Sequence, residues 1–140
     1  YHHLLTVQGD LYQRTPLHWV CRFNNPAVLK VIMRRVTSEQ TQYKLLQELD
    51  SAGHTPLHLA AHRNTTQAIR IIADSVSSHH LIHLLTITDH GLGYTSVQFA
   101  AAWRDNQEAE KTLLQVYHTT AYLIVSALQN KVIIQVNEMV

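Results

Sequence analysis

Apolar residues recur along the chain at helical spacing, in short segments that polar turns separate. The segments 28–32 and 68–72 each carry four apolar side chains in five positions, "VLKVI" and "AIRII". A second kind of apolar segment stands before each of these two, as "LHWVC" and "LHLAA", and a third example, "VQFAA", follows at 97–101. Apolar positions three and four residues apart share one face of an α-helix. The pattern therefore predicts pairs of short antiparallel helices, each with one face to bury.

The helix pairs recur at a period of 40 residues. "RTPLHWVC" at 14–21 is followed by "HTPLHLAA" at 54–61, and "TSVQFAAA" begins at Thr95, 40 positions after Thr55. Self-similarity at a period of about 20–50 residues is typical of repeat proteins. One helix pair cannot bury its apolar face alone, so neighbouring units must stack on each other. The sequence thus predicts three stacked units.

Each unit also carries a helix-start signal. Thr15, Thr55 and Thr95 follow turn-like segments. A threonine hydroxyl at this position can accept a hydrogen bond from a free backbone N–H of the first turn. Pro16 and Pro56 come next, at the first helical position, where the missing N–H costs nothing. We therefore expect the first helix of each unit to begin directly after its threonine.

The second unit, "DSAGHTPLHLAA", resembles the ankyrin repeat, whose pattern is D-x-x-G-x-T-P-L-H-x-A. The first unit has Gln13 in place of the glycine, and the third reads Ser-Val-Gln at 96–98 in place of Pro-Leu-His. The resemblance extends over most of the chain, from residue 4 to residue 130. It implies an all-α solenoid of stacked helix-turn-helix units with turn or hairpin connections. The turn "GDLYQRTPLH" and the long units further resemble the inhibitor-of-NF-κB class of ankyrin domains.

The resemblance gives the repeated Thr-Pro-Leu-His segment a structural role. It implies that Thr15 with His18, and Thr55 with His58, form hydrogen bonds within and between units. Buried polar groups are normally satisfied in this way. We therefore interpret the two histidines as structural rather than as metal ligands or general bases.

The units are longer than the usual ankyrin repeat of about 33 residues. The surplus falls after the second helix and predicts an extra short helix in each unit, at 37–49, 77–88 and 118–128. The expected organisation is a tail of a preceding repeat at 1–9, repeats at 10–49, 50–88 and 89–128, and the start of a further turn segment or a C-terminal cap at 129–140. We expect the chain to be cut from a longer array. Its apolar end, with Val132, Ile133 and Ile134, would be covered by a neighbouring unit or would self-associate.

Composition narrows the classes of partner. The chain has 11 Lys and Arg against 10 Asp and Glu, so nucleic acid and anionic lipid are not expected as main ligands. Its longest apolar run, Ala121 to Val125, is far shorter than the roughly 20 residues that span a bilayer, so no membrane insertion is predicted. The single cysteine, Cys21, cannot form an intramolecular disulfide, which favours an intracellular location, cytoplasmic or nuclear.

Catalytic and metal chemistry are poorly supported. His79, His80 and His83 have a helical spacing that could hold a metal, but no Cys, Asp or Glu stands near them in the sequence, which favours a solvated helix edge. Cys21 aligns with alanines of the other units, so we interpret it as an inert core thiol. An enzymatic alternative, with Cys21 and either His18 or His58, would need an exposed and acidic thiol. We predict no enzyme activity, no metal and no cofactor.

For ankyrin repeats the resemblance implies recognition of a protein partner through turn tips and the concave face of the first helices. Aromatic and arginine side chains, which supply most binding hot spots, recur at these positions. The predicted contact residues are Tyr12, Arg14, His54, His90 and Tyr94 at the tips, and Arg22, Phe23, His62, Arg63 and Trp103 at the helix ends. Trp19 aligns with Leu59 and Phe99 and is expected to face the core.

Two alternatives to this hypothesis stay open. Phe23 and Trp103 could merely cover the ends of helices. The whole array could also be a structural spacer or a self-assembly segment of a larger scaffold or signalling protein, without a partner of its own. A binding module would be sensitive to substitution at these aromatic positions, whereas a spacer would tolerate it.

Overall fold

The computed structural model describes residue 5 and residues 7–8, 11–63 and 65–139. Within these ranges the regular structure is helical throughout, without a β-strand. The helices are α1 (Pro16–Arg22), α2 (Pro26–Arg35), α3 (Glu39–Leu46), α4 (Pro56–His62), α5 (Thr66–Ser75), α6 (Ser78–Thr86), α7 (Ser96–Ala101), the 3-10 helix η2 (Arg104–Asn106) and α8 (Gln107–Met139).

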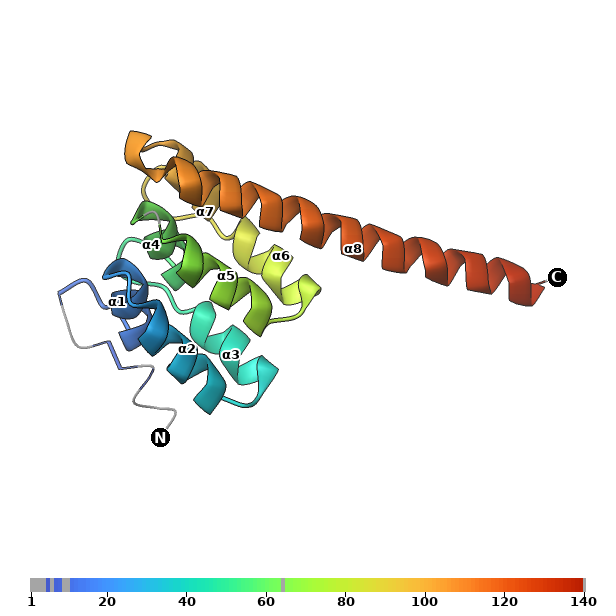
Figure 1. The fold of residues 1–140 in the computed structure, drawn as a ribbon, viewed down its shortest axis with the longest axis horizontal. Helices are drawn as coiled ribbons and strands as arrows, with labels where there is room; N and C mark the ends of the chain where they lie inside the picture. Colours follow the sequence, from blue (N-terminus) through green and yellow to red (C-terminus); the bar gives the residue numbers. More distant parts are fainter. Residues whose placement is uncertain (1–4, 6, 9–10, 64, 140) are drawn as a thin grey trace.

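The helices form rows that run across the units (Figure 1). The first helices make one row, in which α1 packs on α4 and α4 on α7. The second helices make another, in which α2 packs on α5 and α5 on the beginning of α8. The extra helices α3 and α6 form a third row beside them. The predicted all-α solenoid of stacked units, with an extra short helix in the first two, is confirmed.

The threonines start the first helices as the sequence predicts. Thr15, Thr55 and Thr95 each accept a hydrogen bond from the backbone N–H three residues on, and the side chain of that residue accepts one from the backbone N–H of the threonine. Two donors are thus satisfied reciprocally in each unit. Gln98 replaces histidine in the third unit and keeps the arrangement, with Thr95 N–H donating to its Oε1 at 3.0 Å.

The core lies between the rows and is built from aliphatic side chains of every unit. Leu17, Leu57, Leu29 and Ile69 are among those buried almost completely. The prediction that Trp19 faces the core is wrong, because its side chain is only half-buried. Its equivalent in the middle unit, Leu59, is 2% exposed. The difference arises because α4 has a neighbouring first helix on both sides, whereas α1 packs on one such helix within the described residues.

The third unit departs from the expected plan. The short helix expected at 118–128 and the turn segment expected at 129–140 are both wrong, because α8 runs without a break from Gln107 to Met139. Ser38 and Ser77 cap the extra helices of the first two units. Forty residues after Ser77 stands Tyr117, which offers no such cap.

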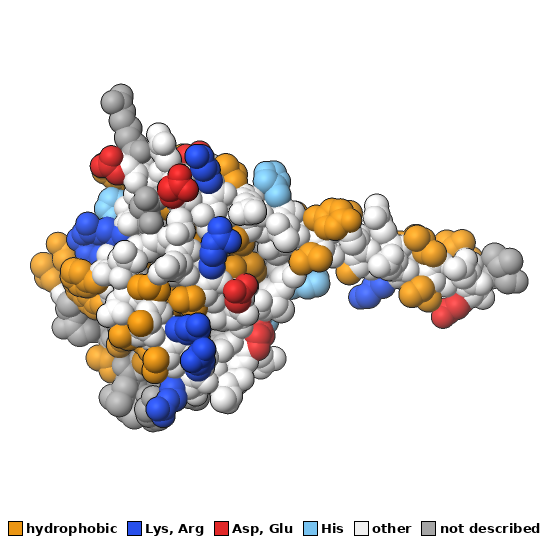
Figure 2. Space-filling model, in the orientation of Figure 1, with side chains coloured by type: hydrophobic (Ala, Val, Ile, Leu, Met, Phe, Trp, Pro, Cys, Tyr) orange, Lys and Arg blue, Asp and Glu red, His pale blue; other side chains and the backbone are white. Residues whose placement is uncertain are grey.

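The local sequence of α8 also favours its continuity. The hydroxyl of Thr120 donates to the carbonyl of Val116 at 2.7 Å within the helix instead of capping a new one. Neither Pro nor Gly occurs after Gly93 to break the helix. Only the first part of α8, up to Thr120, is buried against the array. The remainder projects away from it and exposes its apolar side chains (Figures 1 and 2).

Candidate functional site

The turns before α4 and α7 are held by an aspartate each. Asp50 Oδ1 accepts hydrogen bonds from the N–H groups of Ala52 and His54, at 3.0 and 2.9 Å. Asp89 Oδ1 accepts from Gly93 and Tyr94 in the same way, at 2.9 and 3.1 Å. These side chains satisfy the backbone donors of the turns. The shape of each turn is therefore fixed from within.

Backbone hydrogen bonds join neighbouring turns. Ser51 N–H donates to the carbonyl of Tyr12 at 2.8 Å, and His90 N–H donates to the carbonyl of Ala52 at 2.9 Å. Gly53 has a φ of +78°, and a Cβ built on it would lie 2.5 Å from the His90 ring. Adjacent turns thus lie so close that only glycine fits at this position.

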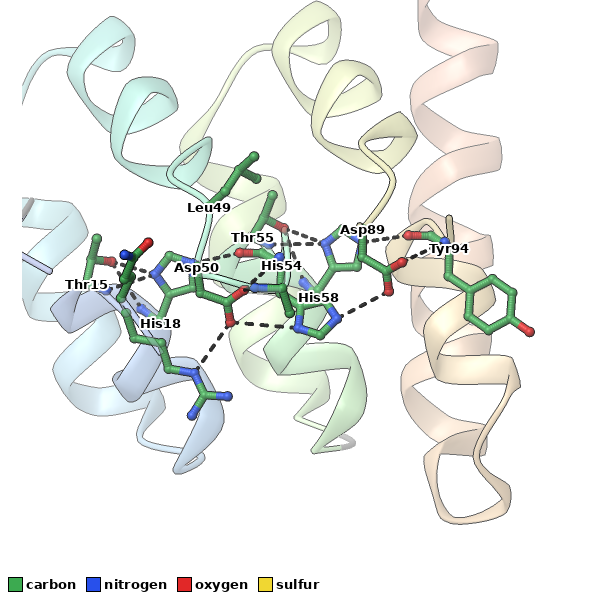
Figure 3. Close-up of polar contacts among 12 residues, drawn as sticks. Thr15, His18, Leu49, Asp50, His54, Thr55, His58, Asp89 and Tyr94 are labelled. Carbon is green, nitrogen blue, oxygen red and sulfur yellow. Dashed lines mark hydrogen bonds and ion pairs between the residues drawn. The ribbon is translucent and has the colours of Figure 1, made fainter. Parts of the chain in front are cut away.

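The two histidines of the repeated motif link successive units (Figure 3). Thr15 N–H donates to Nδ1 of His18 at 3.1 Å, so the proton of the neutral ring is on Nε2, which donates to the carbonyl of His54 at 2.8 Å. His58 is bound in the same way, with its Nε2 2.9 Å from the carbonyl of Tyr94. The predicted hydrogen bonds within and between units are confirmed. Burial lowers the pKa of both rings below the ordinary value.

His54 bridges the carboxylates of two turns, an arrangement that the sequence does not predict (Figure 3). Its Nε2 lies 3.2 Å from Oδ2 of Asp89, and its Nδ1 lies 3.7 Å from Oδ2 of Asp50. Arg14 adds a cation, with Nε 3.5 Å from the same oxygen of Asp50. Burial lowers the pKa of His54, but the hydrogen bonds and charges of the two carboxylates outweigh burial and raise it. The pKa of Asp50 changes in the opposite direction: burial raises it, but the hydrogen bonds and the charge of His54 outweigh burial and hold it well below its usual range.

This chain of contacts changes the roles expected for two predicted contact residues. The side chains of Arg14 and His54 are only 9% and 17% exposed, and both are engaged inside the array. His90 is exposed at its turn, and Tyr94 is half-buried. In the sequence, Asp50 belongs to the same turn as His54, and Asp89 holds the equivalent place in the next turn. These positions predict the bridge only when the two turns are known to stack on each other.

The other predicted residues lie at the ends of the first helices, where aromatic and cationic groups alternate. Phe23 is 65% exposed and Trp103 is 51% exposed. Arg63 is exposed, and Arg22 and His62 are half-buried. The exposed Tyr12 and the half-buried Trp19 lie beside them. We call the surface that these residues form together the aromatic–arginine surface; its members are Tyr12, Trp19, Arg22, Phe23, His62, Arg63 and Trp103.

Ring contacts hold the aromatic side chains of this surface in place. The rings of Trp19 and Phe23 stack, with centroids 5.3 Å apart and planes 10° apart. The guanidinium of Arg14 lies over the ring of Trp19 at 4.9 Å and over that of Tyr12 at 4.6 Å. Such stacked and cation–π contacts stabilise exposed rings by about 0.5–1.5 kcal/mol each. Trp19, which sequence analysis assigned to the core, therefore belongs to the surface and orients Phe23.

His62 organises the other end of the aromatic–arginine surface. Its ring contacts those of Phe99 and Trp103, each with centroids 5.3 Å apart. Its Nδ1 is buried without a hydrogen-bond partner among the described residues. Burial lowers the pKa of His62, and the charges of Arg63 and Arg22 lower it further. A shallow pocket of about 300 Å³ opens beside it, lined by His62, Arg63, Trp103, Asp105 and Asn106.

The fold brings an acidic residue that is distant in the sequence to the histidines at 79, 80 and 83. Glu39 of α3 lies opposite, with Oε1 2.6 Å from Nδ1 of His80. The ring of Tyr43 stacks on His80 at 3.8 Å, and its hydroxyl is hydrogen-bonded to Nδ1 of His83. The contact joins the extra helices of two successive units, so it forms only when α3 and α6 stack side by side. In the described ranges no three or more His, Cys, Asp or Glu side chains gather where they could hold a metal ion.

Cys21 is fully buried, as its alignment with alanine predicts. Burial raises the pKa of its thiol to about 12. The thiol stays protonated at neutral pH and has no access to a substrate, so it lacks the properties of a nucleophile. Among the described residues, no helix has the length and apolar character needed to cross a membrane.

Comparison with known proteins agrees with this architecture. Models of the ankyrin repeat match residues 12–37 and residues 52–76. No curated protein sequence matches the chain significantly. The fold is similar to a chain in the crystal structure of the yeast ribosomal protein Rps3 in complex with its chaperone Yar1. That match has 18% sequence identity and a TM-score of 0.68, and it covers 84% of this chain and 76% of the other.

The stacked helix pairs, joined by hydrogen-bonded turns, place the chain among helical repeat proteins. The matched segments make the class specific: the chain carries two ankyrin repeats, at residues 12–37 and 52–76. Ankyrin repeats are in general protein–protein interaction modules, and proteins built from them are typically non-catalytic.

Proposed function

We propose that this chain is a non-catalytic module that binds a partner protein through its aromatic–arginine surface. The observation that carries the proposal is the exposure of Phe23 and Trp103, at 65% and 51%. The two residues occupy the same position in the first and third units, 80 residues apart, and Arg63 occupies it in the second. Large aromatic and arginine side chains are the commonest binding hot spots.

The fold supports this function by holding the surface rigid before a partner arrives. The stack of Trp19 on Phe23 and the contact of His62 with Trp103 restrict both exposed rings. Immobilising a side chain when a partner binds costs about 0.5–1.5 kcal/mol of binding free energy, and a ring that is already held in place avoids this cost. His90 and Tyr94 extend the proposed contact area toward the turn tips, whereas Arg14 and His54 support it from inside.

Affinity capture from a lysate of the source organism tests the proposal. The wild-type chain is compared with a Phe23→Ala, Trp103→Ala double variant, and with a matched control, Val28→Ala, Val31→Ala, on the exposed face of α2. Circular dichroism first establishes that all three are folded. We expect proteins captured by the wild type and the control to be lost with the aromatic variant. Equal capture by all three, or capture of nothing, contradicts the proposal.

A second candidate function, self-assembly, is favoured by the far part of α8. Beyond Thr120 this helix exposes nine large apolar side chains and carries only two charged ones, Lys131 and Glu138. The apolar residues are Tyr122, Leu123, Val125, Leu128, Val132, Ile133, Ile134, Val136 and Met139. Apolar surface of this extent typically marks a contact between proteins. Sedimentation of the wild type and of Val132→Glu at several concentrations tests it: self-assembly predicts association in the wild type only.

A further inference from the structure

The aromatic–arginine surface carries positive charge that the protein itself does not neutralise. Within the described part of the chain, the guanidinium groups of Arg22 and Arg63 form no ion pair and donate no hydrogen bond. Each guanidinium therefore keeps five N–H donors free. In Figure 2, blue and orange side chains meet at the left edge of the array, on the side where α1 lies in Figure 1.

The electrostatic environment of these groups shows that they act on each other. Burial lowers the pKa of Arg22, and the charges of Arg63 and Arg14 lower it further. Burial likewise lowers the pKa of His62, and the charges of Arg63, Arg22 and Arg14 lower it further. Like charges repel one another, and an anion bound between Arg22 and Arg63 would relieve that repulsion.

The positive charge is local, because the whole chain has a formal net charge of only +1. Several carboxylates are engaged elsewhere: Asp50 and Asp89 hold the turns, and Glu39 binds His80. Asp105 lines the pocket beside Trp103 but forms no ion pair among the described residues. The surface thus combines unpaired guanidinium groups with exposed rings in a protein without a general excess of cations.

A purely structural role does not account for both arginines. Arg22 ends α1 and Arg63 follows α4, so each is near the negative end of a helix dipole. Such an interaction stabilises a helix by about 0.3–1 kcal/mol when the charged group is exposed. It requires no exposed aromatic neighbours, and neither guanidinium donates to a helix-end carbonyl in the described structure. Free guanidinium groups beside preorganised rings are instead what a binding site for a ligand requires.

We propose that the aromatic–arginine surface recognises an acidic peptide segment of its partner, an inference that rests on the proposed function. Carboxylates of the segment bind Arg22 and Arg63, in the bidentate geometry that guanidinium groups favour. Apolar side chains of the segment pack on the rings of Phe23 and Trp103. A single-stranded nucleic acid could stack on the same rings, but it binds mainly through many phosphate contacts, and the described side chains of this surface include two unpaired arginines.

Selection from a phage-displayed library of random peptides tests the proposal directly. The chain itself is the bait, and binding of the selected peptides is then measured for three forms: the wild type, Arg22→Gln with Arg63→Gln, and a matched control, Arg34→Gln with Arg35→Gln, at the exposed end of α2. We expect Asp and Glu to be enriched in the selected peptides. Affinity should fall at least about tenfold in the first variant, equivalent to 1.4 kcal/mol, and stay unchanged in the control.

Three results would overturn the proposal. One is a selection that yields no peptides or yields peptides without acidic enrichment. Another is equal weakening in both arginine variants. The third is tighter binding of a random single-stranded RNA pool than of the selected peptides, which would favour nucleic acid.

The lysate capture distinguishes failure of this inference from failure of the proposed function. If partners are lost with Phe23→Ala, Trp103→Ala but kept with Arg22→Gln, Arg63→Gln, the module binds proteins without recognising acidic segments.

Discussion

At the scale of single residues, one position of the repeat is filled by His18, His58 and Gln98 in turn. All three accept a hydrogen bond from the N–H of their threonine. Only the histidines reach the next unit as well, because a ring carries its second nitrogen on the opposite side. The ring must be neutral for this, since its Nδ1 accepts and its Nε2 donates. The link between units is therefore sensitive to pH.

We expect His58→Gln to flatten the acid side of the stability profile. Burial lowers the folded pKa of His58, so below about 6.5 the unfolded chain takes up the proton first and stability falls with pH. The variant loses the bond to Tyr94, about 1 kcal/mol at pH 8, but has no ring to protonate. Urea unfolding at pH 8 and pH 5 measures both effects. An unchanged difference between the two pH values would contradict this role.

His54 has the opposite dependence on pH. Because the carboxylates of Asp50 and Asp89 raise its folded pKa, its contribution to stability is fully present below about 6.5 and is lost as pH rises through that raised pKa. We expect His54→Gln to destabilise the chain more at pH 6 than at pH 9, in the same unfolding assay. A loss that is larger at pH 9 would show that the charged ring does not bridge the turns.

At the scale of elements, the turns depend on the left-handed conformation at one repeated position. Gly53 and Gly93 have φ values of +78° and +71°, and Gln13 adopts 55° at the equivalent place in the first unit. A residue with a Cβ is strained there by about 1–2 kcal/mol. The turn shape is thus kept in the first unit although glycine is not.

Three alanine substitutions separate strain from crowding in these turns. Gly53→Ala should cost the most, above about 2 kcal/mol, because its Cβ would also lie 2.8 Å from the backbone N of His90. Gly93→Ala should cost about 1–2 kcal/mol, since only strain applies there. Gly91→Ala, with open space and no positive φ, is the control and should change little. Denaturation midpoints measure the order, and a Gly91→Ala variant as unstable as Gly53→Ala would refute it.

Much of the element plan could be predicted from sequence, because the threonine caps, the prolines and the 40-residue period are local or periodic signals. The 40-residue period does not predict the course of α8, because Tyr117 stands where the preceding unit has the capping Ser77. The bridge of His54, the pairing of Glu39 with His80 and the exposure of Trp19 depend on which turns and helices stack. Such contacts between units have no local signature.

At the scale of the whole molecule, the array and the far part of α8 differ in what they contribute to stability. Leu113 is fully buried against the array, whereas the large apolar residues beyond Thr120 that α8 exposes contribute little to its core. Ending the chain after Ala121 should therefore change the unfolding free energy by less than about 1 kcal/mol. Leu113→Ala should cost about 2–5 kcal/mol. Thermal unfolding compares the two, and a truncation as harmful as Leu113→Ala would mean that the projecting helix belongs to the folding unit.

For the whole molecule, the function proposed above requires that a partner protein lies on the aromatic–arginine surface. A photo-crosslinking phenylalanine analogue, placed at residue 23, at residue 103 or at the control position 28 in the full chain, tests it most directly in extract from the source organism. The account predicts a crosslinked protein from positions 23 and 103 and none from Val28, which lies on α2. Crosslinks from Val28 alone, or from none of the three, would contradict it.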